Sequence, residues 1–178
     1  MRKSRKRAVP LTVSRPALLV KSSDAEFRRL IHDLIAYGHR LDACRDAFAA
    51  IVGISGVQYE ILMLVSRAEG LAIGEVAARL HRSGAFITIE ANKLVERGIL
   101  QKASDPADGR RVLLKNTSKS LQLLERLAPH QRRINDVLFD CLDAKRFGQL
   151  RELAGDLLAC GDRAVALLEF LMHEAEAA

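Results

Sequence analysis

Apolar residues recur at intervals of three and four along most of the chain, and this spacing predicts amphipathic helices. The first such run follows the helix-capping pair Ser23-Asp24 and ends at Gly53. A second, nearly apolar run follows Ser55, its expected cap, so a buried helix is expected there. Two shorter runs cover about residues 72–80 and 84–97, with a polar turn between them in which Ser83 is the expected cap of the second run. This spacing predicts a helix-turn-helix.

The pattern changes after Gly98, which stands where a glycine commonly ends a helix. Residues 99–103 and 111–116 form two short runs that are rich in β-branched or long apolar side chains. The loop between them contains Asp-Pro and Asp-Gly, both strong turn signals. An antiparallel hairpin, the wing of a winged helix-turn-helix, is therefore expected directly after the second helix.

Two long helical runs complete the chain, one beginning at Thr117 or Ser118 and one capped by Asp143. Pro129 lies within the first of them and should kink or break it. The terminal helices have apolar stripes larger than this chain can bury by itself. We therefore predict a homodimer interface of ~2,000 Å² or more, which would set two recognition helices on a palindromic DNA site.

The predicted fold class is mainly α with a small β-hairpin wing. Residues 53–117 form the winged helix-turn-helix DNA-binding lobe, and residues 23–52 and 118–176 form the helical dimerisation region. Residues 1–22 are predicted to be a disordered basic tail. This tail either adds non-specific attraction to phosphates or only improves solubility.

The charge distribution favours a nucleic-acid partner. The net charge is +6, and residues 1–20 contribute six basic residues and no acid. Residues 79–115 contain eight basic and four acidic residues, whereas the rest of the body beyond residue 20 is acidic. A basic lobe on an acidic body is typical of a DNA-binding surface, although ordinary fluctuation in composition could also produce it.

Other classes of protein find little support. The chain has no HExxH, GxSxG, Walker or GxGxxG pattern, so neither an enzyme nor a cofactor is expected. Cys44, Cys141 and Cys160 form no CxxC pair, so no metal site is expected, and buried structural thiols are favoured over redox sensors. No apolar run approaches ~18 residues and no secretory signal is visible, which predicts a cytoplasmic protein without a membrane partner.

The sequence resembles the MarR family of winged-helix dimeric transcriptional regulators. The similarity spans about residues 24–175 and is most specific in NKLVERGIL, at residues 92–100, and DPADGRRVLLKNT, at residues 105–117. Three positions depart from the family pattern: Gly109 replaces the first of two wing arginines, Asn116 replaces a leucine, and Ile89 replaces a frequent arginine. The resemblance implies DNA binding, most often as a repressor.

The resemblance also implies that the second helix enters the major groove and that a wing arginine reaches the minor groove. The residues carried over as DNA-facing are Arg82, Ser83, Gly84, Phe86, Thr88, Ile89, Asn92, Lys93, Lys102, Arg110 and Arg111. Thr88 and Asn92 are suited to base edges, and Lys93, Arg82 and Lys102 to phosphates. Phe86 and Ile89 could instead pack at the helix–wing junction. Asp108 is expected to hold Arg110 by an ion pair.

Family members often bind small aromatic acids or phenols, which shift them between DNA-binding states. The candidate ligand-binding residues are Tyr37, His39, Arg40 and Tyr59. Solvated or interface residues are the alternative interpretation for this group. A second alternative concerns the whole protein: the winged helix could serve as a non-specific DNA-binding module or as a protein-interaction module.

Overall fold

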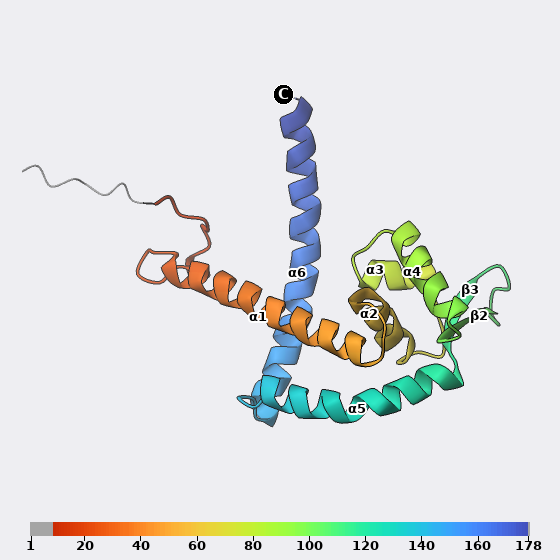
Figure 1. Cartoon of the computed structure of the whole chain (residues 1–178). Coiled ribbons are helices and arrows are strands. Elements are labelled where there is room, and N and C mark those ends of the chain that lie inside the picture. Colours follow the sequence, from red (N-terminus) through yellow and green to blue (C-terminus); the bar gives the residue numbers. More distant parts are fainter. Residues whose placement is uncertain (1–8, 178) are drawn as a thin grey trace, which may run out of the picture. The chain divides into compact units, whose positions relative to one another are not determined.

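The computed structural model describes residues 9–177, and its elements form two compact units (Figure 1). The first unit extends to Gln131 and the second begins at Arg132. The helices are η1 (Pro16–Leu18), α1 (Ala25–Ile51), α2 (Gly56–Val65), α3 (Ile73–Arg79), α4 (Gly84–Glu96), α5 (Ser118–Leu138) and α6 (Ala144–Ala177). The strands are β1 (Leu71–Ala72), β2 (Leu100–Ser104) and β3 (Val112–Asn116). The predicted fold class is confirmed: helices dominate, and the small sheet contains the wing.

The segment before α1 is ordered, which corrects the prediction of a disordered tail for residues 9–22. Thr12 donates to Asp24 Oδ2 through its backbone N–H at 2.8 Å and its hydroxyl at 2.7 Å. Arg28 donates to the same oxygen at 3.0 Å and to the carbonyl of Pro10 at 2.5 Å. A buried carboxylate thus fastens the segment to α1, and short-range composition could not reveal this pairing. Residues 1–8, which hold five of the six basic residues of residues 1–20, lie outside the described residues.

The core of the first unit lies where α1, α2, α3, α4 and the sheet meet. Side chains with no exposed surface come from several of these elements: Ile61, Leu62, Val65, Val76, Ile87, Leu94, Ile99 and Leu114. The predicted cap of α2 is confirmed, since Ser55 Oγ accepts from the backbone of Gln58 and Gln58 Oε1 accepts from the backbone of Ser55, each at 3.2 Å. This capping box satisfies donors at the start of a helix that is otherwise apolar.

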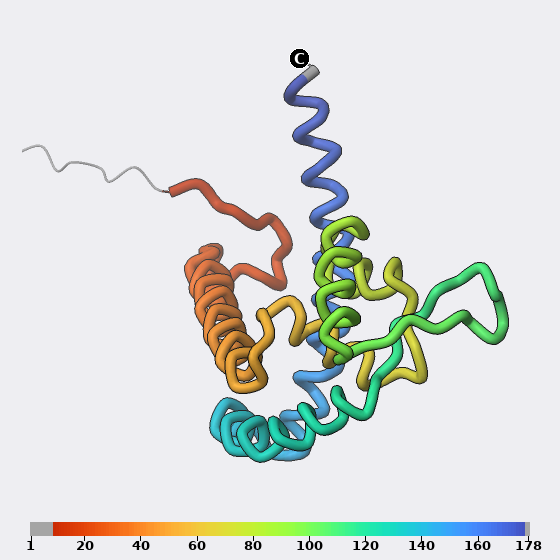
Figure 2. Tube along the Cα trace, turned by 45° about the vertical axis from the view of Figure 1, so that its right-hand side comes forward, coloured from red at the N-terminus to blue at the C-terminus, as the bar shows by residue number. Residues whose placement is uncertain are grey.

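The sheet has the order β1–β3–β2, with both pairs antiparallel. The wing pair aligns Leu100 with Asn116 and Ser104 with Val112, as the hairpin prediction requires. The loop between these strands extends beyond the neighbouring helices (Figure 2). The sequence did not predict β1, because its two residues are too few to establish a period; Leu71 pairs with Leu114.

Two junctions fix the wing behind α4. Gly98 has a φ of +66°, which confirms the expected left-handed helix end. Thr117 Oγ1 lies 2.9 Å from the carbonyl oxygen of Gly98, and Asn116 donates to the carbonyl of Val65 at 3.1 Å. Asn116 therefore supplies a hydrogen-bond donor to a carbonyl at the C-terminal end of α2, which a leucine side chain could not do.

Helix α5 continues through Pro129, so the break that was one of the two predicted outcomes does not occur. A proline removes one backbone donor, and the buried Leu123 and Leu127 on the preceding turns hold the helix in place. In the second unit, Asp143 caps α6 by accepting from the backbone of Arg146 at 2.7 Å.

The burial expected for the cysteines is wrong for two of them. Cys141 and Cys160 are exposed, and Cys44 is half-buried. The apolar neighbours that suggested burial, such as Leu157 and Leu158, are themselves exposed. Among the described residues, no single helix is long and apolar enough to cross a membrane, while α1 and α2 together pass by length and composition but bend by 85° at their junction.

Candidate nucleic-acid interface

Helix α4 has one side in the core and one side in solvent. Ile87, Ala91 and Leu94 have no exposed surface, whereas Phe86 is 40% and Ile89 55% exposed. Ser83 Oγ accepts from the backbone of Phe86 at 3.2 Å and caps the helix as predicted. Packing of Phe86 and Ile89 at the helix–wing junction, the alternative drawn from the sequence, does not bury either side chain. Both remain available to a partner in solution.

The other predicted contact residues of α4 lie on or beside this exposed side. Arg82 is exposed, and Ser83 and Gly84 are exposed at the start of the helix. Thr88 and Asn92 are half-buried, and the Thr88 hydroxyl donates to the carbonyl of Gly84 at 2.7 Å. The hydroxyl oxygen of Thr88 therefore offers an acceptor, and its methyl group an apolar surface, to a base.

Glu90 occupies an unexpected position on α4. It is 9% exposed, and its two carboxylate oxygens accept from Gln58 Nε2 at 2.8 Å and from Lys93 Nζ at 2.6 Å. The hydrogen bond from Lys93 lowers the pKa of Glu90, burial opposes that change, and the hydrogen bond from Gln58 adds to it. The carboxylate is thus ionised inside the lobe rather than on the exposed side of the helix.

The wing contains a second ion-pair network. Arg111 lies 3.4 Å from Glu75 Oε2 in α3 and 3.7 Å from Asp105 Oδ2 in the wing loop. Glu75 also accepts from the backbone of Ala72 at 2.9 Å and so caps α3, which Ala72 cannot do with its own side chain. Arg111 therefore connects the wing to the first helix of the helix-turn-helix.

Asp108 does not form the ion pair with Arg110 that was expected. Its side chain instead accepts from the backbone N–H of Arg110 at 3.1 Å, and its carbonyl accepts from the backbone of Arg111 at 2.8 Å. Aspartate commonly closes a turn in this way, because its short side chain reaches the backbone two residues on. The side chains of Arg110 and Lys102 are exposed on the wing.

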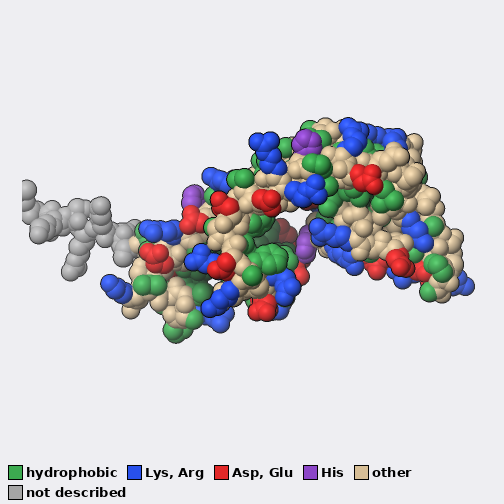
Figure 3. Space-filling model, turned by 90° about the horizontal axis from the view of Figure 1, so that it is seen from below, with side chains coloured by type: hydrophobic (Ala, Val, Ile, Leu, Met, Phe, Trp, Pro, Cys, Tyr) green, Lys and Arg blue, Asp and Glu red, His purple; other side chains and the backbone are tan. Residues whose placement is uncertain are grey.

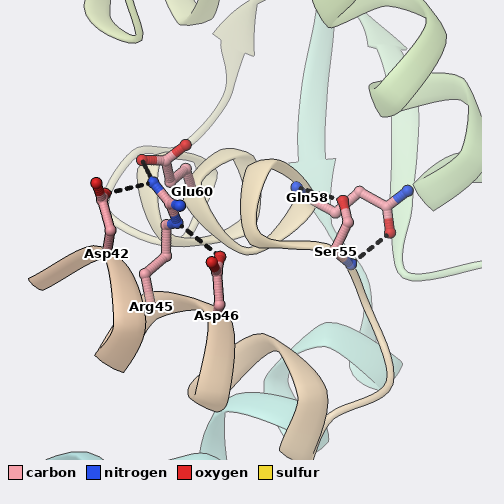
Figure 4. Close-up of polar contacts among 6 residues, drawn as sticks. All are labelled: Asp42, Arg45, Asp46, Ser55, Gln58 and Glu60. Carbon is pink, nitrogen blue, oxygen red and sulfur yellow. Dashed lines mark hydrogen bonds and ion pairs between the residues drawn. The ribbon is translucent and has the colours of Figure 1, made fainter. Parts of the chain in front are cut away.

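The lobe is joined to α1 by a cluster of charged side chains (Figure 4). Arg45 lies 2.7 Å from Asp42, 3.0 Å from Asp46 and 3.4 Å from Glu60 in α2. The hydrogen bond to Asp46 is the main cause of a raised pKa of Arg45. A Cβ at Gly56 would lie 2.9 Å from Arg45 Nε, so this close approach of α1 and α2 favours glycine.

The predicted ligand residues do not converge on one site. Tyr37 and Arg40 line a hollow of about 240 Å³ on α1, and Arg40 also donates to the carbonyl of Ala36 at 2.6 Å. Tyr59 lines a separate hollow of about 250 Å³. His39 is exposed and lines neither of these two hollows.

The lining of the hollow at Tyr59 is mostly apolar: Tyr59, Glu60, Met63, Leu64, Arg67 and Leu80. Tyr59 OH accepts from Gln131 of α5 at 2.8 Å, and burial raises the pKa of Tyr59. The sequence reasoning had named only Tyr59 from this lining, and it did not include Met63 or Arg67.

On the face in Figure 3, basic and acidic side chains are mixed and are interspersed with hydrophobic ones. Within residues 9–177 no group of three or more His, Cys, Asp or Glu side chains could hold a metal ion. The arrangement of α4 and the wing is therefore the main structural indication of a binding surface.

The described architecture, a helix-turn-helix followed by a β-hairpin and flanked by long helices, defines a winged-helix protein. Residues 52–111 match the model of the MarR family. A curated relative, the helix-turn-helix-type transcriptional regulator YhbI of Bacillus subtilis, is 25% identical over 104 residues, which are 58% of this chain and 68% of the relative. Residues 52–111 are thus similar to the MarR family, and the chain has a winged-helix fold.

Solved structures have the same fold. CouR from Rhodococcus jostii, bound to p-coumaroyl-CoA, superimposes with a TM-score of 0.68 at 20% identity and covers 76% of this chain and 95% of its own. A MarR variant from E. coli complexed with operator DNA superimposes with a TM-score of 0.60 at 21% identity and covers 75% and 94%.

Proposed function

We propose that this protein is a sequence-specific regulator of transcription that binds double-stranded DNA through α4 and the wing. The observation that carries this proposal is the two-sided α4: Ile87 and Leu94 anchor the helix, while Phe86 and Ile89 are exposed with the capped N-terminus beside them. A helix N-terminus attracts phosphates, and side chains along the exposed side can reach base edges. The MarR variant bound to operator DNA supports the same use of this fold.

The regulator acts as a homodimer on a palindromic operator and works as a repressor. Support comes from large side chains of α6 that are exposed within one chain: Phe147, Leu150, Leu153, Leu157, Leu158, Val165, Leu167, Leu168, Phe170, Leu171 and Met172. Leu30, Ile31, Leu34 and Ile35 of α1 are likewise 40–55% exposed. Apolar surfaces of this extent are typical of protein interfaces. A second copy of the chain would cover them and supply the second recognition helix.

Release from DNA follows binding of a small aromatic or phenolic ligand in the hollow at Tyr59. Its volume of about 250 Å³ is below the ~300–1,000 Å³ of drug-sized sites, which favours a single ring. The guanidinium of Arg67 can pair with the carboxylate of a ligand there. Glu60, the acidic residue of the same lining, does not compete for Arg67 because it pairs with Arg45. The structure of CouR with an aromatic acyl thioester supports an aromatic ligand for this fold.

Selection of bound duplexes from a random pool tests the function. We expect a palindrome with half-sites about one helical turn apart, preferred over random DNA by ~10³-fold or more at ~150 mM salt. A ratio near one would contradict a sequence-specific regulator and would favour the non-specific or protein-interaction module. Thermal-shift screening of aromatic carboxylates against the wild type and Arg67→Ala tests the ligand, because binding to the folded state raises Tm.

A further inference from the structure

We propose that Glu90 is a positioning residue for DNA binding: it orients α4 against α2 through Gln58 and holds the ammonium group of Lys93. This inference rests on the proposed function, because it concerns the helix assigned to the major groove. By its charge alone, Glu90 would only make that helix less cationic. Its contacts give it a specific role instead.

Glu90 lies on the buried side of α4, where a carboxylate needs hydrogen-bonding partners. Its neighbours on the buried side, Ile87, Ala91 and Leu94, are apolar and have no exposed surface. A charged side chain at such a site loses hydration, and it is tolerated only where hydrogen bonds replace the lost water. Glu90 meets this condition because each oxygen receives a donor, at 2.8 Å from Gln58 and 2.6 Å from Lys93.

Gln58 gives the contact its direction. Its Oε1 accepts from the backbone of Ser55 at 3.2 Å, so the amide orientation is set by the capping box and Nε2 is directed to Glu90 (Figure 4 shows Ser55 and Gln58). Gln58 is 6% exposed and has little room to rotate. Apolar contacts allow a helix to slide or turn, whereas hydrogen bonds weaken steeply with misalignment. The chain Ser55–Gln58–Glu90 therefore fixes the rotation of α4.

Lys93 connects this internal contact to the surface that would meet DNA. Its side chain is 52% exposed while that of Glu90 is only 12% exposed. In the free protein the pair carries no net charge, and a phosphate must compete with Glu90 for the ammonium group. Glu90 thereby weakens attraction to any DNA backbone and keeps α4 in the orientation that a particular operator requires. The first effect lowers the affinity for all DNA alike, and the second raises the preference for operator over random DNA.

The test compares Glu90→Gln, Gln58→Leu and the control Glu96→Gln, all in the full-length chain. Glu96 lies at the exposed end of the same helix, so its substitution removes one charge there without touching the network. Affinity for the selected operator and for random DNA is measured at several salt concentrations. Tm is recorded for each variant to verify that it is folded.

Glu90→Gln has one acceptor oxygen in place of two and no charge, so it cannot serve Gln58 and Lys93 as the carboxylate does. We expect its binding to random DNA to become tighter, with a salt slope steeper by up to ~0.9, the value for one phosphate contact. The operator preference should fall roughly ten-fold, near the lower end of one base contact. Gln58→Leu leaves the pair with Lys93, so the preference should fall while the salt slope stays as in the wild type.

Equal behaviour of Glu90→Gln and Glu96→Gln in both readouts would overturn the inference. If the wild type shows no operator preference, the proposed function fails, yet the salt slope on random DNA still decides whether Glu90 restrains Lys93. A loss of affinity for all DNA in proportion to a lower Tm would mean that Glu90 only supports folding, and that result also overturns the inference. If Glu90→Gln does not fold, Gln58→Leu decides: an unchanged operator preference in this folded variant contradicts a positioning role.

Discussion

Arg111 in the wing lies 3.4 Å from Glu75 in α3, so the hairpin is attached to the first helix of the helix-turn-helix by an ion pair. The same glutamate caps α3 through the backbone of Ala72. Arg110, the neighbouring residue, has only its backbone held, by Asp108. Two adjacent arginines that looked equivalent in the sequence thus have different surroundings, and we propose different roles for them.

Arg110→Ala should lower affinity for an operator with A·T-rich flanks by ~5-fold or more, because a narrow minor groove attracts an inserted arginine and one good base contact contributes about 1–3 kcal/mol. Tm should stay within about a degree, since the side chain is exposed. Electrophoretic or fluorescence titration against operators with A·T-rich and G·C-rich flanks measures the effect. An equal loss on both flanks would show that Arg110 only contacts phosphate.

Glu75→Gln should reproduce the part of the Arg111→Ala effect that comes from their ion pair, and the double variant should be no worse than Arg111→Ala alone. Glutamine can still accept from Ala72, so the cap of α3 is kept while the ion pair is lost. An exposed pair of this kind contributes only about 0.2–1 kcal/mol to stability, and the change should therefore appear mainly as greater mobility of the wing. Hydrogen exchange of residues 100–116 measures it, and additive effects of the two substitutions would contradict the coupling.

The sequence predicted most of the winged-helix lobe because its signals are local. Ser55, Ser83 and Gly98 mark helix ends by their own chemistry, and their contacts in the structure match those expectations. Contacts between residues distant in the chain could not be predicted in this way. The attachment of Thr12 to Asp24 and of Arg111 to Glu75 depends on the folded geometry, and no period in the sequence indicates either.

For Glu90, the sequence indicated the buried position but not the hydrogen-bond partner. Its spacing of three from Ile87 and four from Leu94 places it on the buried side of α4, so the period did contain the signal. The charge of the residue concealed it, because glutamate is rarely buried unless paired. The partner, Gln58, lies 32 positions away and could be found only in the structure.

Two isoleucines of α4 offer a matched test of packing against binding. Ile87 has no exposed surface, whereas Ile89 is 55% exposed. Ile87→Ala should lower the free energy of unfolding by about 2–5 kcal/mol, and Ile89→Ala by less than about 0.5 kcal/mol. Ile89→Ala should instead weaken operator binding. Chemical denaturation and DNA titration of both variants measure this, and a large stability loss in Ile89→Ala would show that the side chain is packed.

The attachment of the N-terminal segment should depend on pH in the acid range. Hydrogen bonds from Thr12, supported by Arg28, hold the pKa of Asp24 at about 2, below its ordinary value of 3.8. Because the folded pKa is lowered, the contribution of Asp24 is complete above about pH 3.8 and is lost as the pH falls toward 2. Exchange of the Thr12 amide, followed by NMR, should quicken over this range. Asp24→Asn should remove the dependence, and Asp33→Asn, an exposed aspartate of α1, should retain it.

The proposed dimer is open to an equally direct test on α6. Phe147, Leu150, Ala154, Leu157, Gly161, Ala164, Leu168 and Leu171 follow one another at alternating spacings of three and four, the period of a helix–helix seam. Leu157 is 50% exposed in the single chain. Leu157→Glu would place a charge in the middle of this seam, where a partner helix would strip it of water.

We expect wild-type protein to sediment at twice the mass of one chain at micromolar concentration, and Leu157→Glu to shift toward a single chain. Gln149→Glu is the control, since it introduces the same residue at an exposed position of the same helix off the seam. The operator affinity of Leu157→Glu should fall with the dimer, because one recognition helix then binds without the other. A Leu157→Glu protein that sediments as the wild type does would show that Leu157 is not part of the interface. A wild type that sediments as one chain would contradict the proposed homodimer.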